Sequence, residues 1–246
     1  MTDKMNLAID IGNSSAKMAV IEHGQVVDTF RTDRPDSAYI DSVLDHYPSV
    51  QAAILSSARG VHPGLEAGLR RRVGRYIRFD HTVPVPIKNR YETPETLGAD
   101  RLAAAVGAAG AYPGRNVLIV DFGTAITIDM VSAAGEFLGG NISPGVGTRF
   151  RSLHDYTQQL PLRGLTEETT LLGRNSFSAI ESGVIRGVIY EIEGYIAELS
   201  REYPDLNIIF TGGDGNFFAR HVKNPIFATH ELVLYGLNRI LEYNAD

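Results

Sequence analysis

The sequence predicts an α/β protein built from two duplicated lobes. Two short apolar strands, residues 7–9 and 117–120, each end at an Asp-x-Gly turn that leads into a second strand. A glycine turn, at Gly24 in the first half and Gly135 in the second, then precedes a third β-rich segment. A single Asp-x-Gly turn is an ordinary feature, but the same order of elements at the head of each half indicates an internal duplication.

The polar residues of these two turns predict a site for a metal and a phosphate. In the second turn, Asp121 offers a carboxylate to a cation or a water, Gly123 lets backbone amides approach a bulky ligand, and Thr124 offers a hydroxyl. The first turn, residues 10–14, repeats this pattern as Asp-Ile-Gly-Asn-Ser. If the two turns face a common cleft, they hold a phosphate chain between them.

The composition excludes several other classes of function. At 246 residues, with 43% hydrophobic residues, the chain can form one large core or two fused lobes. A net charge of -6, with Arg70-Arg71-Arg72 as the one basic run, argues against a nucleic-acid partner. The chain has no stretch apolar and long enough for a membrane span, no signal-like start and no cysteine, so we expect a soluble, cytoplasmic protein. The histidines lack ligand spacing, and a zinc site is not expected.

Periodicity and turn residues define the expected elements of each lobe. The Tyr-Pro-Gly sequence at 112–114 predicts a boundary between an N-terminal lobe, 1–112, and a C-terminal lobe, 113–246. In the first lobe we expect helices at 37–46, 64–73 and 96–111, strands at 52–57 and 76–79, and an extended proline-rich connector at 83–86. In the second we expect a strand at 125–131, a glycine-rich loop at 139–146, helices at 148–157 and 232–243, an irregular segment at 160–173 and a strand at 207–210.

A long helix is expected to begin at Asn175-Ser176. Ile180, Val184, Val188 and Ile192 recur at i, i+4 spacing and predict its buried face, and Gly183 and Gly187 are expected to allow tight packing on that side.

The helix at 96–111 carries a charged pair near its start. Asp100 lies in the region where the helix dipole favours a negative charge, and Gly98 and Ala99 beside it are small. On the residues alone, the ordinary interpretation is that Asp100 caps the helix and that Arg101 forms a surface ion pair. The alternative is that small residues here admit a ligand.

Taken in order, several motifs resemble type III pantothenate kinase, a family of the actin, sugar-kinase and heat-shock-chaperone superfamily. They are DIGNSSAK at 10–17, Tyr91 followed by GADR at 98–101, DFGTAITID at 121–129, LGGNISPG at 138–145, Asn175-Ser176, and TGGD at 211–214. The resemblance runs over nearly the whole chain. It implies ribonuclease H-like (actin-like ATPase) lobes with an interlobe cleft, and ATP-dependent phosphorylation of pantothenate to 4′-phosphopantothenate, the first step of coenzyme A biosynthesis.

For the nucleotide, the resemblance implies two phosphate segments and an adenosine-side motif. Asp121 matches the position that holds a monovalent cation, K⁺ or NH₄⁺, and Asp10 would help to place Mg²⁺. The residues implied in binding ATP are Asp10, Ile11, Gly12, Asn13, Ser14, Ser15, Ala16, Lys17, Gly123, Thr124, Gly212 and Gly213.

For the acceptor, the resemblance implies a pantothenate site in which Asp100 is the general base and Arg101 pairs with the substrate carboxylate. The implied contacts are Tyr91, Gly98, Ala99, Asp100, Arg101 and Ser176. Members of the family are usually homodimers whose pocket is completed across the interface. The chain has Ser14 and Ser176 where the family commonly has threonine, which keeps both hydroxyls.

Two other functions remain to be separated from this one. The first is a nucleotide-binding accessory or regulatory protein of the same fold without turnover, and the second is a kinase for another small alcohol. The joint presence of Asp10, Asp100, Arg101 and Asp121 favours the enzyme, because a binding module has no need for an acid beside a carboxylate anchor.

Overall fold

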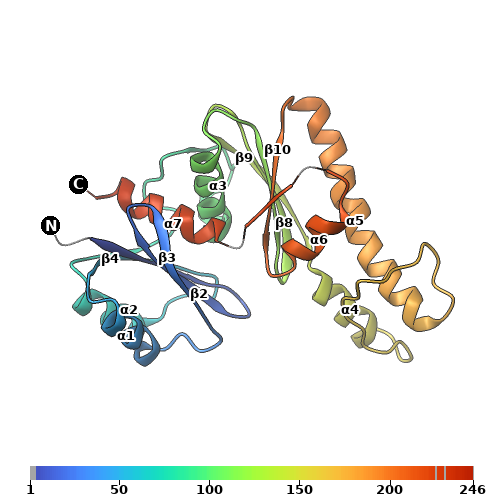
Figure 1. The fold of residues 1–246 in the computed structure, drawn as a ribbon, viewed down its shortest axis with the longest axis horizontal. Coiled ribbons are helices and arrows are strands. Elements are labelled where there is room, and N and C mark those ends of the chain that lie inside the picture. The colour runs from blue at the N-terminus through green and yellow to red at the C-terminus, as the bar shows by residue number, and fades with distance from the viewer. Residues whose placement is uncertain (1–3, 225, 230, 246) are drawn as a thin grey trace. The chain divides into compact units, whose positions relative to one another are not determined.

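The computed structural model describes residues 4–224, 226–229 and 231–245, and its chain groups into two compact units (Figure 1). The first unit comprises Met1–Gly114, Val131–Gly139 and Glu231–Asp246, and the second comprises Arg115–Met130 and Gly140–His230. The division into lobes at residue 112 stays a prediction about domain organisation. No helix among the described residues is both long and apolar enough to span a membrane.

The first unit is built on a five-stranded sheet. Its strands are β1 (Met5–Ile11), β2 (Ala16–Glu22), β3 (Gln25–Thr32), β4 (Val50–Ser57) and β5 (Arg75–Arg78), in the order β3-β2-β1-β4-β5. The first three strands are antiparallel, and β4 is parallel to β1 and β5. Gly24 makes the β2–β3 turn with φ +74°, a conformation that glycine adopts without strain. The predicted strand–turn–strand–turn–strand pattern is confirmed in this unit.

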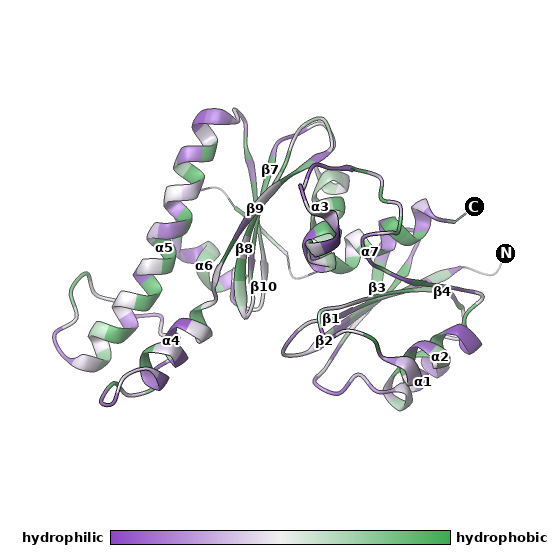
Figure 2. Cartoon of the chain, turned by 180° about the vertical axis from the view of Figure 1, so that it is seen from behind, coloured by the Kyte–Doolittle hydropathy of each residue, from purple (hydrophilic) through white to green (hydrophobic). Residues whose placement is uncertain are grey.

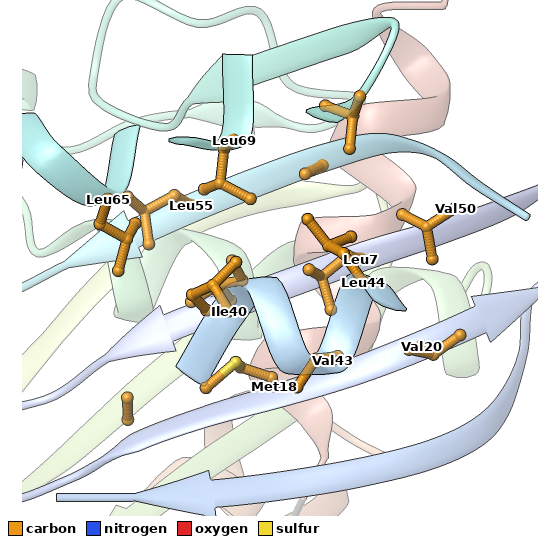
Figure 3. Close-up of a cluster of buried hydrophobic side chains, with 14 of the residues drawn as sticks. Leu7, Met18, Val20, Ile40, Val43, Leu44, Val50, Leu55, Leu65 and Leu69 are labelled. Carbon is orange, nitrogen blue, oxygen red and sulfur yellow. The ribbon is translucent and has the colours of Figure 1, made fainter. Parts of the chain in front are cut away.

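Two helices cover one face of this sheet, because parallel strands need crossover connections. α1 (Ser37–His46) begins at Asp36, whose carboxylate accepts from the Tyr39 N–H at 2.9 Å, and α2 (Pro63–Arg72) follows β4. Between helices and sheet lies the cluster in Figure 3, in which side chains of β1, β2 and β4 meet Ile40, Leu44 and Leu69 of the helices. Figure 2 shows hydrophobic residues in the central strands and hydrophilic ones on α2.

The opposite face of the sheet carries α3 (Ala99–Ala111) and α7 (Leu232–Tyr243). The Asn6 amide of β1 donates to Asn238 of α7 at 2.8 Å, which shows that the even-numbered residues of β1 face this side. The two helices lie in direct backbone contact, since a Cβ on Gly236 would come 1.8 Å from the Ala103 carbonyl oxygen. We expected helix 232–243 to complete the second lobe, but it packs in the first unit, where α3 and the sheet bury its leucines.

A second sheet has the strand order β11-β10-β7-β8-β9-β6. These strands are β6 (Lys88–Asn89), β7 (Val117–Phe122), β8 (Ala125–Val131), β9 (Glu136–Pro144), β10 (Asn207–Gly212) and β11 (Phe227–Ala228), of which β6 and the start of β9 belong to the first unit. β10 is parallel to β7 and to β11. Gly135 makes the β8–β9 turn with φ +71°, so the pattern of the first sheet is repeated.

The glycine-rich loop expected at 139–146 is wrong, because residues up to Pro144 continue strand β9. The glycine at 140 serves close packing within the sheet instead. A Cβ on Gly140 would lie 2.2 Å from both the Ile128 carbonyl oxygen and Asp129 Oδ1. The glycine that indicated a loop in the sequence instead allows two neighbouring strands to lie in contact.

The remaining elements are a short 3₁₀ helix at Pro94–Thr96, α4 (Val146–Asp155), α5 (Ser176–Glu202) and α6 (Gly215–His221). The expected stripe of α5, Ile180 to Ile192 at i, i+4 spacing, is buried as predicted. The packing role of Gly183 and Gly187 is not confirmed, because a Cβ at either position would meet nothing within 4 Å. Both glycines face away from the core of their own chain.

Candidate active site

The first implied phosphate segment forms one tight hairpin between β1 and β2. Asp10 pairs with Lys17 across the strands, and the Gly12 N–H donates to the Ser15 carbonyl oxygen at 3.1 Å to close the turn. The tip of the turn, Asn13 and Ser14, is exposed, whereas the residues that support it are buried: Ile11, Ser15 and Ala16. The backbone at the tip is thus open to a ligand and held rigidly from below.

Asp100 lies in the first turn of α3, where the dipole favours its charge. Its Oδ1 accepts from the Arg101 N–H at 2.9 Å. A Cβ on Gly98 would come 2.5 Å from Asp100 Oδ1, so glycine at this helix start leaves room for the carboxylate. Gly98 itself provides no side-chain cap.

A pocket of about 270 Å³ opens beside this carboxylate, which is close to the lower end of ordinary small-molecule sites. Its walls come from the carboxyl ends of β4 and β5 and from the start of α3, and they include Ser56, Ser57, Gly98, Ala99 and Asp100. The structure therefore gathers three implied substrate residues in a single cavity of the first unit.

Strand register connects this pocket to the phosphate turn. Asp10 is paired with Ser56 and Ile11 with Ser57 in the parallel β1–β4 ladder, and the Ala58 N–H donates to the Ile11 carbonyl oxygen at 2.8 Å. Neighbouring strands lie about 4.8 Å apart. Asp10 also shares the even-numbered face of β1 that carries α3 and α7. The turn and the Asp100 pocket thus occupy one edge of one sheet, outside the carboxyl ends of its parallel strands, where α/β folds usually bind ligands.

Arg101 is not the surface side chain that the ordinary interpretation expected. It is 6% exposed, and its guanidinium carbon lies 5.6 Å from the centre of the Tyr91 ring and 5.9 Å from that of Phe137. Stacking of this kind suits the planar guanidinium. Tyr91 and Arg101 are in contact with each other, but neither is among the described residues that line the Asp100 pocket.

The second implied phosphate segment is the β7–β8 turn of the second unit. The Gly123 N–H donates to the Ala125 carbonyl oxygen at 3.1 Å, and both Gly123 and Thr124 are exposed. The Thr124 carbonyl oxygen accepts from the Gly145 N–H at 3.0 Å and from Thr148 Oγ1 at 2.7 Å. The start of α4 therefore anchors this turn through its main chain and leaves the turn tip accessible.

The end of β10 lies against Asp121. Gly212 has φ +86°, and a Cβ there would come 2.4 Å from Asp121 Oδ1, whereas a Cβ on Gly213 would meet nothing within 4 Å. Burial raises the pKa of the Asp214 carboxyl that follows. In the second unit the structure thus brings together Asp121, the exposed turn and the Thr-Gly-Gly-Asp motif.

Ser176 is the exposed first residue of α5, in the second unit, so the implied pantothenate residues come from both units. The preceding Asn175 forms a capping box, because its Oδ1 accepts from the Ser178 N–H at 3.0 Å. The Asn-Ser pair is therefore also a helix-start signal.

The described residues contain no cluster of three or more His, Asp or Glu side chains that could hold a metal. A magnesium ion at Asp10 or a monovalent ion at Asp121 would have to take other ligands from phosphates, waters or carbonyl oxygens, which is usual for Mg²⁺. Sequence reasoning missed Ser56 and Ser57. The signal that could have found them is their position at the carboxyl end of a buried strand.

Solved structures of other proteins share this fold. The activator of the 2-hydroxyisocaproyl-CoA dehydratase from Clostridium difficile, with bound ADPNP, matches with a TM-score of 0.53 at 12% identity, covering 97% of this chain and 93% of that one. The inorganic polyphosphate/ATP-glucomannokinase from Arthrobacter sp. strain KM matches with a TM-score of 0.51 at 16% identity, covering 98% and 99%. These likenesses confirm the predicted actin-like, sugar-kinase fold class.

Curated relatives match at much higher identity. A type III pantothenate kinase of Phocaeicola vulgatus is 42% identical over 240 residues, covering 98% of this chain and 99% of the relative. A type III pantothenate kinase of Bacteroides fragilis is 40% identical, covering 98% of both chains. The model of the type III pantothenate kinase family matches residues 6–198. On this similarity and on the fold, the chain belongs to the type III pantothenate kinase family.

Proposed function

We propose that this protein transfers the γ-phosphoryl group of ATP to pantothenate, giving 4′-phosphopantothenate and ADP, the first step of coenzyme A biosynthesis. Membership of the family supports the reaction. The structural observation that carries it is the Asp100 pocket, which lies on the same sheet edge as the β1–β2 phosphate turn. An acceptor hydroxyl and a phosphate chain can meet there.

In this proposal Asp100 is the general base. Its carboxylate takes the proton of the pantothenate primary alcohol while that oxygen bonds to the γ-phosphorus and the bond from phosphorus to the β–γ bridging oxygen breaks. Base catalysis of this kind contributes about 10²–10⁴-fold. Gly98 and Ala99 line the pocket beside Asp100, and Ser176 is proposed as a further contact of the acceptor.

Arg101 is proposed to pair with the pantothenate carboxylate, a task for which its planar fork is suited. The rings of Tyr91 and Phe137 fix the guanidinium, so little side-chain entropy is lost when the anion binds. Tyr91 is proposed to contact the same substrate.

The nucleotide is proposed to bind along both turns. Residues 10–17 and the Gly123-Thr124 turn would hold the phosphates through backbone N–H groups and hydroxyls, and Gly212-Gly213 would lie on the adenosine side. Asp10 would help to hold Mg²⁺, and Asp121 would hold K⁺ or NH₄⁺. These ions supply neutralisation of phosphate charge when bound, which, with in-line placement, carries most of phosphoryl-transfer catalysis.

We also propose that the protein works as a homodimer in the cytoplasm, with no nucleic-acid or membrane partner. The exposed apolar side chains of α5, Phe177 and Tyr190, each 53% exposed, would suit an interface between copies. Sedimentation of the purified protein would test the dimer.

The function is tested by mass detection of phosphopantothenate formed from ATP and pantothenate with K⁺, NH₄⁺ or Na⁺ in turn. We expect product with K⁺ or NH₄⁺ and a strongly depressed rate with Na⁺. ATP binding without product would favour the accessory protein, and ATP consumption with a different alcohol would favour another kinase. Equal rates with Na⁺ and K⁺ would contradict the proposed role of Asp121 in binding a monovalent cation, but would leave the proposed reaction unaffected.

A further inference from the structure

Two arginines contact the β1–β2 phosphate turn from opposite sides. Arg31, on β3, donates from Nε to Ser15 Oγ at 3.2 Å. Arg59, in the β4–α2 loop, donates from Nη2 to the Asn13 carbonyl oxygen at 2.9 Å. Both arginines are exposed, and they lie 16 and 46 residues along the chain from the turn residues that they contact.

Arg31 and Arg59 bring two positive charges to this turn. Among the residues that the structure describes, neither Arg31 nor Arg59 forms an ion pair. Lys17 pairs with Asp10 on one side and with Arg31 on the other, so one carboxylate faces two cations across β1, β2 and β3. Like charges directly opposite each other destabilise a sheet. A bound anion would relieve this arrangement.

Arg59 also lies between the two parts of the candidate site. Its backbone N–H donates to Ser57 Oγ at 3.1 Å, and the neighbouring Ala58 lines the Asp100 pocket. Its guanidinium reaches the tip of the phosphate turn. In the proposed reaction, the phosphoryl group passes from the turn that holds the donor to the pocket that holds the acceptor. A guanidinium has several N–H donors in a planar fork, and the Asn13 carbonyl uses only part of that capacity.

We propose that Arg59 binds the terminal phosphate of ATP and that Arg31 is a positioning residue, which holds the turn through Ser15 and adds positive charge beside it. The inference rests on the proposed function, since it names further residues for that nucleotide. Charge-assisted hydrogen bonds to phosphate are the strong ones, so loss of Arg59 should weaken ATP binding about tenfold or more.

The test is the dissociation constant of ATP, ADP and adenosine, measured by calorimetry with Mg²⁺ at low and high salt. The variants are Arg59→Ala, Arg59→Lys and Arg31→Ala, and the matched control is Arg71→Ala, which removes an exposed arginine from α2. We expect Arg59→Ala to lose most affinity for ATP, less for ADP and none for adenosine, with a weaker salt dependence and partial recovery in Arg59→Lys. Arg31→Ala should weaken ATP and ADP alike.

Two results overturn the inference while leaving the kinase function intact. One is an Arg59→Ala variant that binds ATP as tightly as Arg71→Ala. The other is an equal loss for ATP, ADP and adenosine, because that pattern marks general damage to the site. A wild-type protein that does not bind ATP would instead count against the proposed function itself.

Discussion

At the scale of single residues, the site depends on side chains whose roles follow from contacts between distant parts of the chain. The sequence identified Asp100 and Arg101 as a pair, and their positions at the start of α3 are close to those expected. It could not show that Arg101 is buried against Tyr91 and Phe137, because those rings are brought to it by segments elsewhere in the chain. Likewise, nothing local to Arg31 or Arg59 indicates a phosphate turn.

The role of Gly212 in the structure also differs from the role expected from the sequence. The family resemblance implied that both glycines of the Thr-Gly-Gly-Asp motif lie near the nucleotide, but Gly212 has a structural role of its own. Its positive φ and the 2.4 Å approach of a Cβ to Asp121 Oδ1 leave no room for a side chain. Gly213, with open space around it, remains the better candidate for ligand contact.

Gly212→Ala should therefore lower the free energy of unfolding by about 1–3 kcal/mol, through backbone strain and displacement of Asp121. Gly213→Ala should change it by less than about 0.5 kcal/mol, since a surface change without new contacts has little effect. Urea unfolding of the two variants measures the difference. Equal stability would show that β10 moves away from β7 at no cost.

At the scale of elements, periodicity and turn chemistry predicted most helices and strands. Helices 37–46 and 232–243 and strand 125–131 agree with α1, α7 and β8, because each has an apolar pattern with clear ends. The second half of β9 was missed because its glycines resemble loop residues, while in the sheet they allow contact with β8. The role of a glycine in close packing depends on the segment that lies against it, and the local sequence does not identify that segment.

The contact between α3 and α7 gives a prediction at this scale. Gly236→Ala would drive a Cβ to 1.8 Å from the Ala103 carbonyl oxygen, so the helices must separate. We expect the free energy of unfolding to fall by about 1–3 kcal/mol. Because α3 carries Asp100, we also expect the KM for pantothenate to rise.

Gly68→Ala is the matched control, in helix α2, where the nearest atom to the new Cβ would be 4.0 Å away. This change should be neutral or stabilising by about 0.4–1 kcal/mol, because alanine restricts the unfolded chain. Thermal unfolding and the KM of both variants measure the effect. If Gly236→Ala unfolds and binds like Gly68→Ala, the two helices have room to adjust.

At the scale of the whole molecule, the duplication could be predicted from the sequence. Each sheet contains the same pattern of three consecutive strands, with a glycine turn before the third, at φ +74° and +71°. The sequence did not predict that the C-terminal helix α7 packs in the first unit. The hydrogen bond that marks it joins Asn6 to Asn238, 232 residues apart, and no local pattern encodes such a contact. The kinase function could be predicted because its motifs occur along the chain in the order typical of the family.

In the proposed reaction Asp100, in a pocket beside the phosphate turn, removes the proton from the acceptor alcohol. The single-turnover rate of phosphopantothenate formation by Asp100→Asn tests this role, with pantothenate binding measured alongside. The control is Asp41→Asn, which changes a half-buried carboxylate of α1 that pairs with Arg72. We expect Asp100→Asn to fold and to bind pantothenate like the wild type, with turnover lowered by about 10²–10⁴-fold, and Asp41→Asn to keep wild-type activity. Turnover near the wild-type rate in Asp100→Asn would contradict it and return Asp100 to a helix-start role.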